Sequence, residues 1–235
     1  METNNFNYVQ SEQETASMSK TFLANVFSWM FLALVITGVT SYIFGTNREL
    51  LSLLIGETGF TPLGYIVMFS PIAFVLVMNF GFERLSFGAI VGLFTLYSLV
   101  MGMSLSFIFV IFAHAFIFQT FFVTAGTFGV MAVLGYTTKT DLTKLGTILF
   151  MALIGVIIAS IVMIFTGGDT FIIDCLCVLI FTGLTAYKVQ MLKNLGASAS
   201  LDTEQGKKMA VWGAMSLYIT FINLFMTLLR LFGRK

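Results

Sequence analysis

Seven long apolar segments dominate this chain and restrict the folds that are open to it. Each has roughly the 20 residues that an α-helix needs to cross about 30 Å of hydrocarbon. Because backbone polar groups inside a bilayer must bond to one another, such segments are expected to be helices. The sequence therefore predicts an all-α membrane protein with seven transmembrane helices, at approximately residues 22–44, 63–81, 87–111, 116–135, 146–166, 171–191 and 209–232.

The composition agrees with this fold class. Hydrophobic residues make up 58% of the chain and charged residues 10%, whereas a soluble domain carries about 25% charged residues. The net charge of +1 gives no case for nucleic-acid binding. Residues 1–20 are polar and have no apolar periodicity, so a flexible N-terminal tail is predicted there, followed by one transmembrane domain over 21–235.

The last segment carries a polar stripe along one helical face. Its small and polar residues follow one another at spacings of three and four, which keeps them on one side of a helix. Lipid cannot bond these groups, so we expect the stripe to face other helices or a water-filled cavity, with the last helix enclosed by the other six. Interhelical hydrogen bonding and pore lining both remain open as roles for the stripe, which consists of Gly213, Ser216, Thr220, Asn223, Thr227 and Arg230.

Small residues predict further helix contacts, because they let backbones approach closely. The third segment presents such a face with a GxxxG pair, and the fourth and fifth segments carry shorter ones. The expected contact residues are Gly88, Gly92, Thr95, Ser98, Gly102 and Ser106, then Ala125, Gly126 and Gly129, then Gly155 and Ala159.

Basic residues predict the orientation. With seven spans, the side that holds the N-terminus carries seven lysines and arginines and the other side carries four. The positive-inside rule then places the N-terminus in the cytoplasm.

No catalytic, cofactor or metal site is predicted. Cys175 and Cys177 are two residues apart in a helix and point in nearly opposite directions, so we expect free thiols. His114 has no acidic or cysteine neighbour in sequence and is interpreted as an interfacial residue. The chain lacks a His-Glu-x-x-His helix and a pair of membrane aspartates, so an enzyme is not expected.

Three motifs, in order, resemble the transmembrane Bax inhibitor motif family, also called the Bax inhibitor-1 family, and its bacterial members in particular. The first runs from Phe121 to Leu142 and includes Gly-Tyr-Thr-Thr-Lys-Thr-Asp. The second is Phe181-Thr-Gly-Leu-Thr-Ala-Tyr-Lys-Val-Gln190. The third is Ser216-Leu-Tyr-Ile-Thr-Phe-Ile-Asn-Leu-Phe225, with Leu228-Leu-Arg-Leu-Phe-Gly233 after it.

This resemblance implies a seven-helix fold with a central last helix, in the bacterial plasma (inner) membrane. It also implies two functions. Family members are described as calcium-leak channels that respond to pH, with calcium or another cation as the permeant ion, and some bacterial members as partners of a membrane-bound ATP-dependent protease.

The chain departs from the family at the two aspartates that sense pH. Lys188 and Thr220 occupy those positions here. A shared proton between two carboxylates makes a pH latch, and neither carboxylate is present. A lysine also repels a divalent cation, by roughly 7 kcal/mol at a separation of about 5 Å and an effective dielectric constant of about 20. If Lys188 points inward, we expect no calcium conduction by the family's route.

Three charged side chains have two interpretations each. Lys188 either reaches the headgroups or is a buried cation that replaces the latch or pairs with an acid. Arg230 either extends outward to the interface or contacts a substrate. Asp174, near the start of the sixth segment, either marks the interface or attracts cations at the outer mouth.

Overall fold

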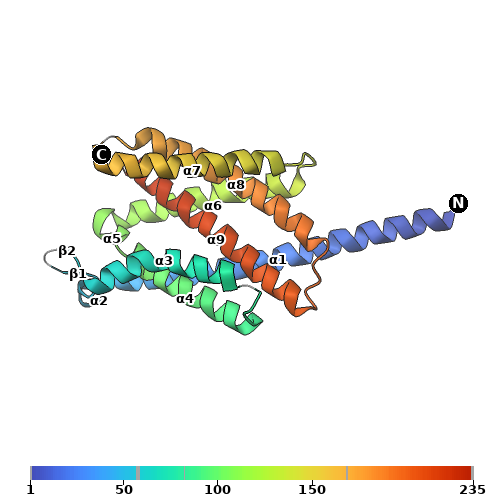
Figure 1. Ribbon diagram of the computed structural model, residues 1–235, viewed down its shortest axis with the longest axis horizontal. Coiled ribbons are helices and arrows are strands. Elements are labelled where there is room, and N and C mark those ends of the chain that lie inside the picture. Colours follow the sequence, from blue (N-terminus) through green and yellow to red (C-terminus); the bar gives the residue numbers. More distant parts are fainter. Residues whose placement is uncertain (1, 57–58, 82, 168, 234–235) are drawn as a thin grey trace. The chain divides into compact units, whose positions relative to one another are not determined.

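The computed structural model describes residues 2–56, 59–81, 83–167 and 169–233, with the side chains of 2–13, 79 and 164 excepted. Almost all of this chain is helical (Figure 1). In order, the elements are α1 (Glu2–Thr46), α2 (Arg48–Ser52), β1 (Ile55–Gly56), β2 (Gly59–Phe60), α3 (Pro62–Gly81), α4 (Phe87–Leu105), α5 (Ile108–Ile111), α6 (His114–Thr137), α7 (Thr143–Thr166), α8 (Phe171–Gly196) and α9 (Glu204–Phe232).

The predicted class is confirmed, because each of the seven predicted segments coincides with helical structure. Six helices of the described chain, α1, α4 with α5, α6, α7, α8 and α9, are long and apolar enough to cross a membrane by length and composition. The described part of α3 that is apolar, Pro62–Met78, is shorter. The count of seven spans therefore depends on α3, although the 20 residues of that helix lie where the second span was predicted.

Two boundaries differ from the prediction. The first helix begins well before the predicted span, because residues 2–20 are part of α1, and Ser19 is buried. The third predicted span ends as a helix at Leu105, and α5 follows after a break at Ser106 and Phe107. The Ser106 hydroxyl donates to the Met103 carbonyl, so the side chain takes up a backbone acceptor at the end of α4.

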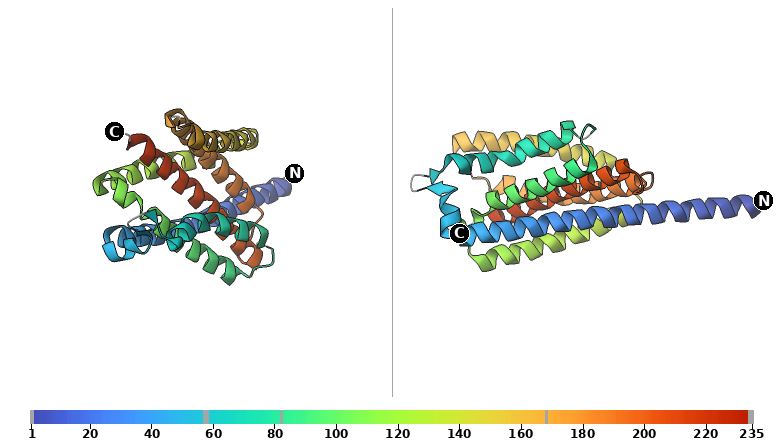
Figure 2. Two further views of the ribbon diagram at one scale, coloured as in Figure 1. Left: turned by 60° about the vertical axis from the view of Figure 1, so that its left-hand side comes forward. Right: turned by 90° about the horizontal axis from the view of Figure 1, so that it is seen from below.

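The chain forms two compact units. The first contains residues 118–200 and 216–235 together with the start of α1, and the second contains 25–117 and 201–215. Within the first, α7 and α8 lie side by side (Figures 1 and 2). Gly167 ends α7 with φ 68°, a left-handed conformation that glycine adopts without a steric penalty, and its N–H donates to the Met163 carbonyl.

In the second unit, α1 and α4 are in close contact. The Thr37 hydroxyl donates to the Ser98 carbonyl at 3.0 Å. A Cβ at Gly102 would lie 2.7 Å from the Thr37 carbonyl oxygen, so the backbones approach as the small-residue face predicted. The same face is open at Gly88 and Gly92, where an added Cβ would meet nothing within 4 Å. Within the described chain, the predicted contact at the GxxxG pair of Gly88 and Gly92 is therefore wrong. The predicted contact at Gly102, in the C-terminal half of the same face, is confirmed.

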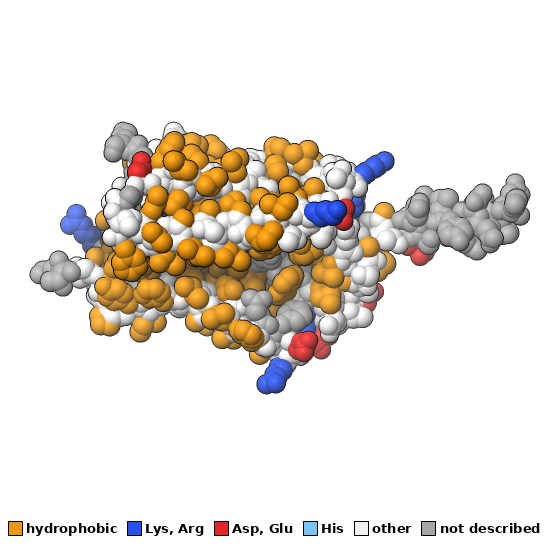
Figure 3. Space-filling view, turned by 45° about the horizontal axis from the view of Figure 1, so that its top comes forward, with side chains coloured by type: hydrophobic (Ala, Val, Ile, Leu, Met, Phe, Trp, Pro, Cys, Tyr) orange, Lys and Arg blue, Asp and Glu red, His pale blue; other side chains and the backbone are white. Residues whose placement is uncertain are grey.

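Burial distinguishes α9 from the other helices. From Lys208 to Leu229 no side chain of α9 is exposed, and Leu217, Tyr218, Leu224 and Leu229 are fully buried. By contrast, α7 exposes many large apolar side chains, Ile154, Ile158 and Ile161 among them. Figure 3 shows hydrophobic side chains spread over the face that it draws, as expected for a surface that meets lipid. The prediction of an enclosed last helix is confirmed.

Candidate functional site

The two positions that the resemblance assigned to the family's aspartates are in contact. The Lys188 ammonium on α8 donates to the Thr220 hydroxyl oxygen on α9 at 2.8 Å and to the Ser216 carbonyl at 3.1 Å. Thr220 is buried, and its own hydroxyl donates to Ser216 at 2.9 Å. Lys188 therefore points inward, and the interpretation in which it reaches the headgroups is wrong. We refer to these contacts among Lys188, Thr220 and Ser216 as the ammonium bridge.

The part of α8 that holds Lys188 is positioned from two sides. On one side α6 comes so close that a Cβ at Gly135 would lie 2.8 Å from the Ala186 Cα. On another side Gly146 of α7 lies against the Tyr187 ring, which would be 2.6 Å from an added Cβ. Both glycines lack the side chain that would keep the helices apart, so α8 is fixed just before Lys188.

Two residues after Lys188, Gln190 connects α8 to the loop between α6 and α7. Its amide nitrogen donates to the Thr140 carbonyl at 2.7 Å, and its amide oxygen accepts from the Leu142 N–H at 2.8 Å. The side chain is buried, so both polar ends are satisfied where water has little access. This contact holds the end of α8 that follows the ammonium bridge.

A second charged contact joins α8 and α9 at their other ends. The Arg230 guanidinium lies 3.2 Å from a carboxylate oxygen of Asp174. The Asp174 side chain is only 3% exposed, and that of Arg230 is 54% exposed. Arg230 thus neutralises a buried carboxylate while part of it stays at the surface. Sequence analysis missed this pair, although both residues fall at helix ends that an antiparallel arrangement brings together.

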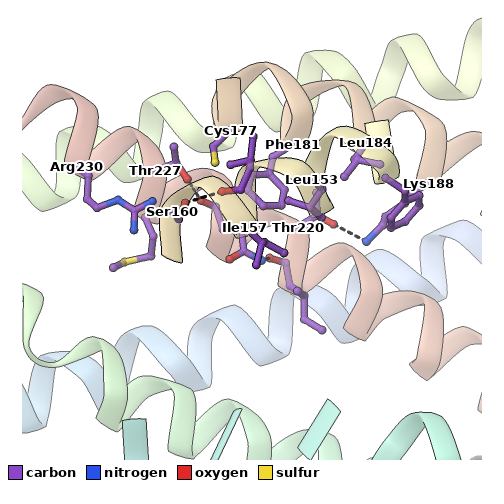
Figure 4. Close-up of a pocket in the computed structure, with 15 residues that line it drawn as sticks. Leu153, Ile157, Ser160, Cys177, Phe181, Leu184, Lys188, Thr220, Thr227 and Arg230 are labelled. Carbon is purple, nitrogen blue, oxygen red and sulfur yellow. Dashed lines mark hydrogen bonds between the residues drawn. The ribbon is translucent and has the colours of Figure 1, made fainter. Parts of the chain in front are cut away.

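A cavity of about 410 Å³ lies between these two contacts, among α7, α8 and α9. In Figure 4, Lys188 and Arg230 are at opposite ends of the residues drawn, with Ser160, Cys177 and Thr227 between them. The walls are mainly apolar and include Phe150, Leu153, Phe181 and Leu184. The stripe residues Thr220, Asn223 and Thr227 line the α9 side of the cavity.

The polar groups that line this cavity bond largely within their own helices. The hydroxyls of Ser160 and Thr227 donate to the carbonyls four residues earlier, and an amide N–H of Asn223 does the same. These bonds differ from the interhelical bonding that was one interpretation of the stripe. Because the hydroxyl protons are used by the backbone, the oxygens of Ser160, Thr220 and Thr227 are left as acceptors. Three stripe residues nevertheless contact α8: Ser216 and Thr220 accept from Lys188, and Arg230 pairs with Asp174.

The remaining candidate residues are two cysteines and a histidine. Cys175 and Cys177 are free thiols, as predicted, and the second is buried. His114 begins α6, with its ring 5.3 Å from that of Phe109. Within the described residues no three His, Cys, Asp or Glu side chains gather closely enough to hold a metal ion.

Comparison with known proteins places this chain in a family. The family model described as "Inhibitor of apoptosis-promoting Bax1" matches residues 19–235. The inner membrane protein YbhL of Escherichia coli K12 is 39% identical over 219 residues, which cover 92% of each chain. An uncharacterized protein of Borreliella burgdorferi is 40% identical over 228 residues, covering 96% of this chain and 97% of the relative. The chain is therefore a multi-pass membrane protein that belongs to the Bax inhibitor-1 family.

Proposed function

We propose that this protein does not leak calcium through the contact between α8 and α9, and that it acts in the membrane as a non-conducting modulator of other proteins. The observation that supports this proposal is the ammonium bridge, in which Lys188 binds Thr220 at 2.8 Å. A fixed positive charge occupies the place where the family resemblance implies two aspartates.

The bridge acts against calcium through its charge. Within the described residues no acidic side chain forms an ion pair with Lys188, so its charge is not cancelled locally. A divalent cation about 5 Å away would be repelled by roughly 7 kcal/mol at an effective dielectric constant of about 20. Such a barrier reduces occupancy by about five orders of magnitude, since about 1.4 kcal/mol corresponds to a factor of ten.

The bridge also removes the family's pH latch. Two facing carboxylates can hold one proton between them and separate when they lose it. An ammonium bound to a hydroxyl and a carbonyl has no shared proton of this kind. We therefore expect the contact between α8 and α9 to persist over the pH range in which an aspartate pair would open.

The partner in this proposal is a membrane-bound ATP-dependent protease, which is the class that the family resemblance suggests for bacterial members. The proposal places the protein in the bacterial inner membrane with its N-terminus in the cytoplasm, on the basis of the positive-inside rule and of the relative in Escherichia coli. A modulator needs no conducting path, so the ammonium bridge is compatible with this role.

Calcium flux into proteoliposomes tests the first half of the proposal. Liposomes that contain a calcium dye and the wild-type protein should show no more flux than protein-free liposomes. The double variant Lys188→Asp with Thr220→Asp restores both carboxylates and should create a leak that depends on pH. Lys193→Asp is the matched control, because Lys193 lies on the same helix but donates to the Tyr136 carbonyl. A wild-type leak as large as that of the double variant, with the same pH response, would contradict the proposal.

Degradation assays test the second half. The protein and a purified membrane-bound ATP-dependent protease are placed in the same liposomes, and the rate of ATP-dependent substrate cleavage is compared with that of the protease alone. We expect the rate to change in proportion to the amount of the protein. An unchanged rate over a tenfold range of ratios would count against a modulator of this protease class.

A further inference from the structure

The cavity among α7, α8 and α9 has the dimensions of a narrow slot. Along α8 its lining runs from Cys177 to Lys188, and along α7 from Phe150 to Ser160. These spacings correspond to about 15 Å at a rise of about 1.5 Å per residue. Its volume of about 410 Å³ is at the lower end of the range for small-molecule sites. A space of this length and volume suits one extended chain and is too small for a two-chain phospholipid.

Charge distinguishes the two ends of the slot. At one end Arg230 is neutralised by Asp174. At the other end the Lys188 ammonium has three protons, of which two are donated to Thr220 and Ser216. No third acceptor and no acidic partner of this ammonium is found among the described residues. An anionic group at this end would gain a charge-assisted hydrogen bond and would neutralise a partly buried cation.

The middle of the slot is mainly apolar. Its walls carry Phe181, Leu184 and Met226, which favour an apolar chain. The oxygens of Ser160 and Thr227 present acceptors, because their protons are used by backbone carbonyls. Acceptors repel a carboxylate, so a ligand that fits carries one charge at one end and an apolar body.

A ligand of this kind can reach the slot from the bilayer. One wall is α7, whose side chains Ile154, Ile158 and Ile161 are each at least half exposed on an apolar surface. Ile157 lines the slot and is itself 51% exposed, so the wall is one side chain thick at this point. A single-chain amphiphile dissolved in the membrane would therefore approach the slot laterally.

We propose that this slot binds a single-chain carboxylate, a fatty acid, with its carboxylate at Lys188 and the adjoining part of its chain between α7, α8 and α9. The inference goes beyond the proposed function and adds a second observation, the cavity, to the ammonium bridge. A protein that conducts calcium could still bind a fatty acid there, and one that does not conduct could fail to bind it. Binding is measured without ion flux, so the two ideas succeed or fail separately.

The test uses the full-length protein in phosphatidylcholine nanodiscs with cis-parinaric acid, a fatty acid that fluoresces in apolar surroundings. We expect saturable binding to the wild-type protein, and binding at least about tenfold weaker for the methyl ester, which has no negative charge. Lys188→Gln should weaken acid binding by about tenfold or more, while Lys193→Gln should leave it unchanged. Lys188→Arg keeps the charge and should retain binding, which separates loss of the site from loss of the fold.

A second pair of variants tests where the chain lies. Ser160→Phe fills the slot from α7 and should abolish binding, whereas Ile158→Phe adds the same ring on the exposed side of α7 and should not. Equal affinity of the wild-type protein and Lys188→Gln for the acid would overturn the proposal, as would equal effects of the two phenylalanine variants. Displacement of the probe by phosphatidylglycerol in the nanodisc, in a manner that requires Lys188, would show that a two-chain lipid is the ligand and would also overturn it.

Discussion

The close approach of α6 to α8 makes a quantitative prediction for Gly135→Ala. The new Cβ would lie 2.8 Å from the Ala186 Cα and carbonyl carbon, and closer still to the carbonyl oxygen. Carbon atoms in contact prefer separations of about 3.5–4.0 Å, so the two backbones must move apart by about 1 Å. Overpacking of this kind costs about 1–3 kcal/mol, and the obstacle is backbone, which cannot rotate away as a flexible side chain can.

Gly129→Ala on the same helix is the matched control. A Cβ there would meet nothing within 4 Å. Both variants gain up to about 1 kcal/mol from the greater helix propensity of alanine. We therefore expect Gly135→Ala to lower the free energy of unfolding by about 1–2 kcal/mol and Gly129→Ala to leave it unchanged or raise it slightly. The difference between them, about 2 kcal/mol, isolates the contact.

Reversible unfolding in mixed micelles, followed by circular dichroism as the denaturing detergent fraction rises, gives both free energies. Thermal unfolding in a mild detergent is an independent check, with a lower Tm expected for Gly135→Ala alone. If the two variants shift stability equally, the packing of α6 on α8 at Ala186 is not as described, and the positioning of Lys188 two residues later loses its explanation.

Three further predictions follow from single contacts. Arg230→Gln leaves the Asp174 carboxylate, 3% exposed, without its cation and should destabilise the protein by about 1–3 kcal/mol in the same unfolding assay, whereas Arg230→Lys should recover part of the loss. Gln190→Leu releases the loop between α6 and α7, so proteolysis or hydrogen exchange should speed up in that loop and not in the loop after α8. The hydrogen bonds from the Thr143 hydroxyl and N–H lower the pKa of Asp141, a loop residue. The Asp141 carboxylate therefore stabilises the folded loop above its unfolded pKa, and this stabilisation is lost as the pH falls through the lower pKa of the folded state. Thr143→Ala should raise the pKa of Asp141 in an NMR titration.

Hydropathy was sufficient to predict the helices, because a bilayer leaves the backbone so few alternatives. It could not predict the break after α4, where the Ser106 side chain replaces one helical hydrogen bond and the chain stays apolar on both sides. Nor did it indicate that residues 2–20 continue α1, since polar composition alone does not distinguish a tail from a helix that projects beyond the apolar span.

Contacts between helices were harder to predict than the helices. The small-residue pattern identified Gly102 correctly but also pointed to Gly88, Gly126 and Gly155, each of which has open space beside it. The glycine that brings α6 against α8, Gly135, was not singled out. Glycine spacing gives the face on which a neighbour could approach, and only the tertiary arrangement decides at which turn it does so.

The sequence was enough to predict which residues form the ammonium bridge, but it was not enough to predict the hydrogen bonds that they make. The family resemblance pairs Lys188 with Thr220, and the structure has them 2.8 Å apart. The direction of the lysine side chain could not be derived, because reaching headgroups and burying the ammonium are both open to a lysine about two turns from the end of a helix. The pair formed by Asp174 and Arg230 required the antiparallel register of α8 and α9.

The ammonium bridge also restricts the order in which acidic residues can be introduced at positions 188 and 220. If Thr220→Asp comes first, the new carboxylate faces Lys188 and forms an ion pair, so the intermediate is tolerated. If Lys188→Asp comes first, the new carboxylate faces a hydroxyl and a carbonyl and gains no cation. The single variant Thr220→Asp should therefore be more stable than the single variant Lys188→Asp, and a stable double variant is reached most easily when Thr220→Asp is made first.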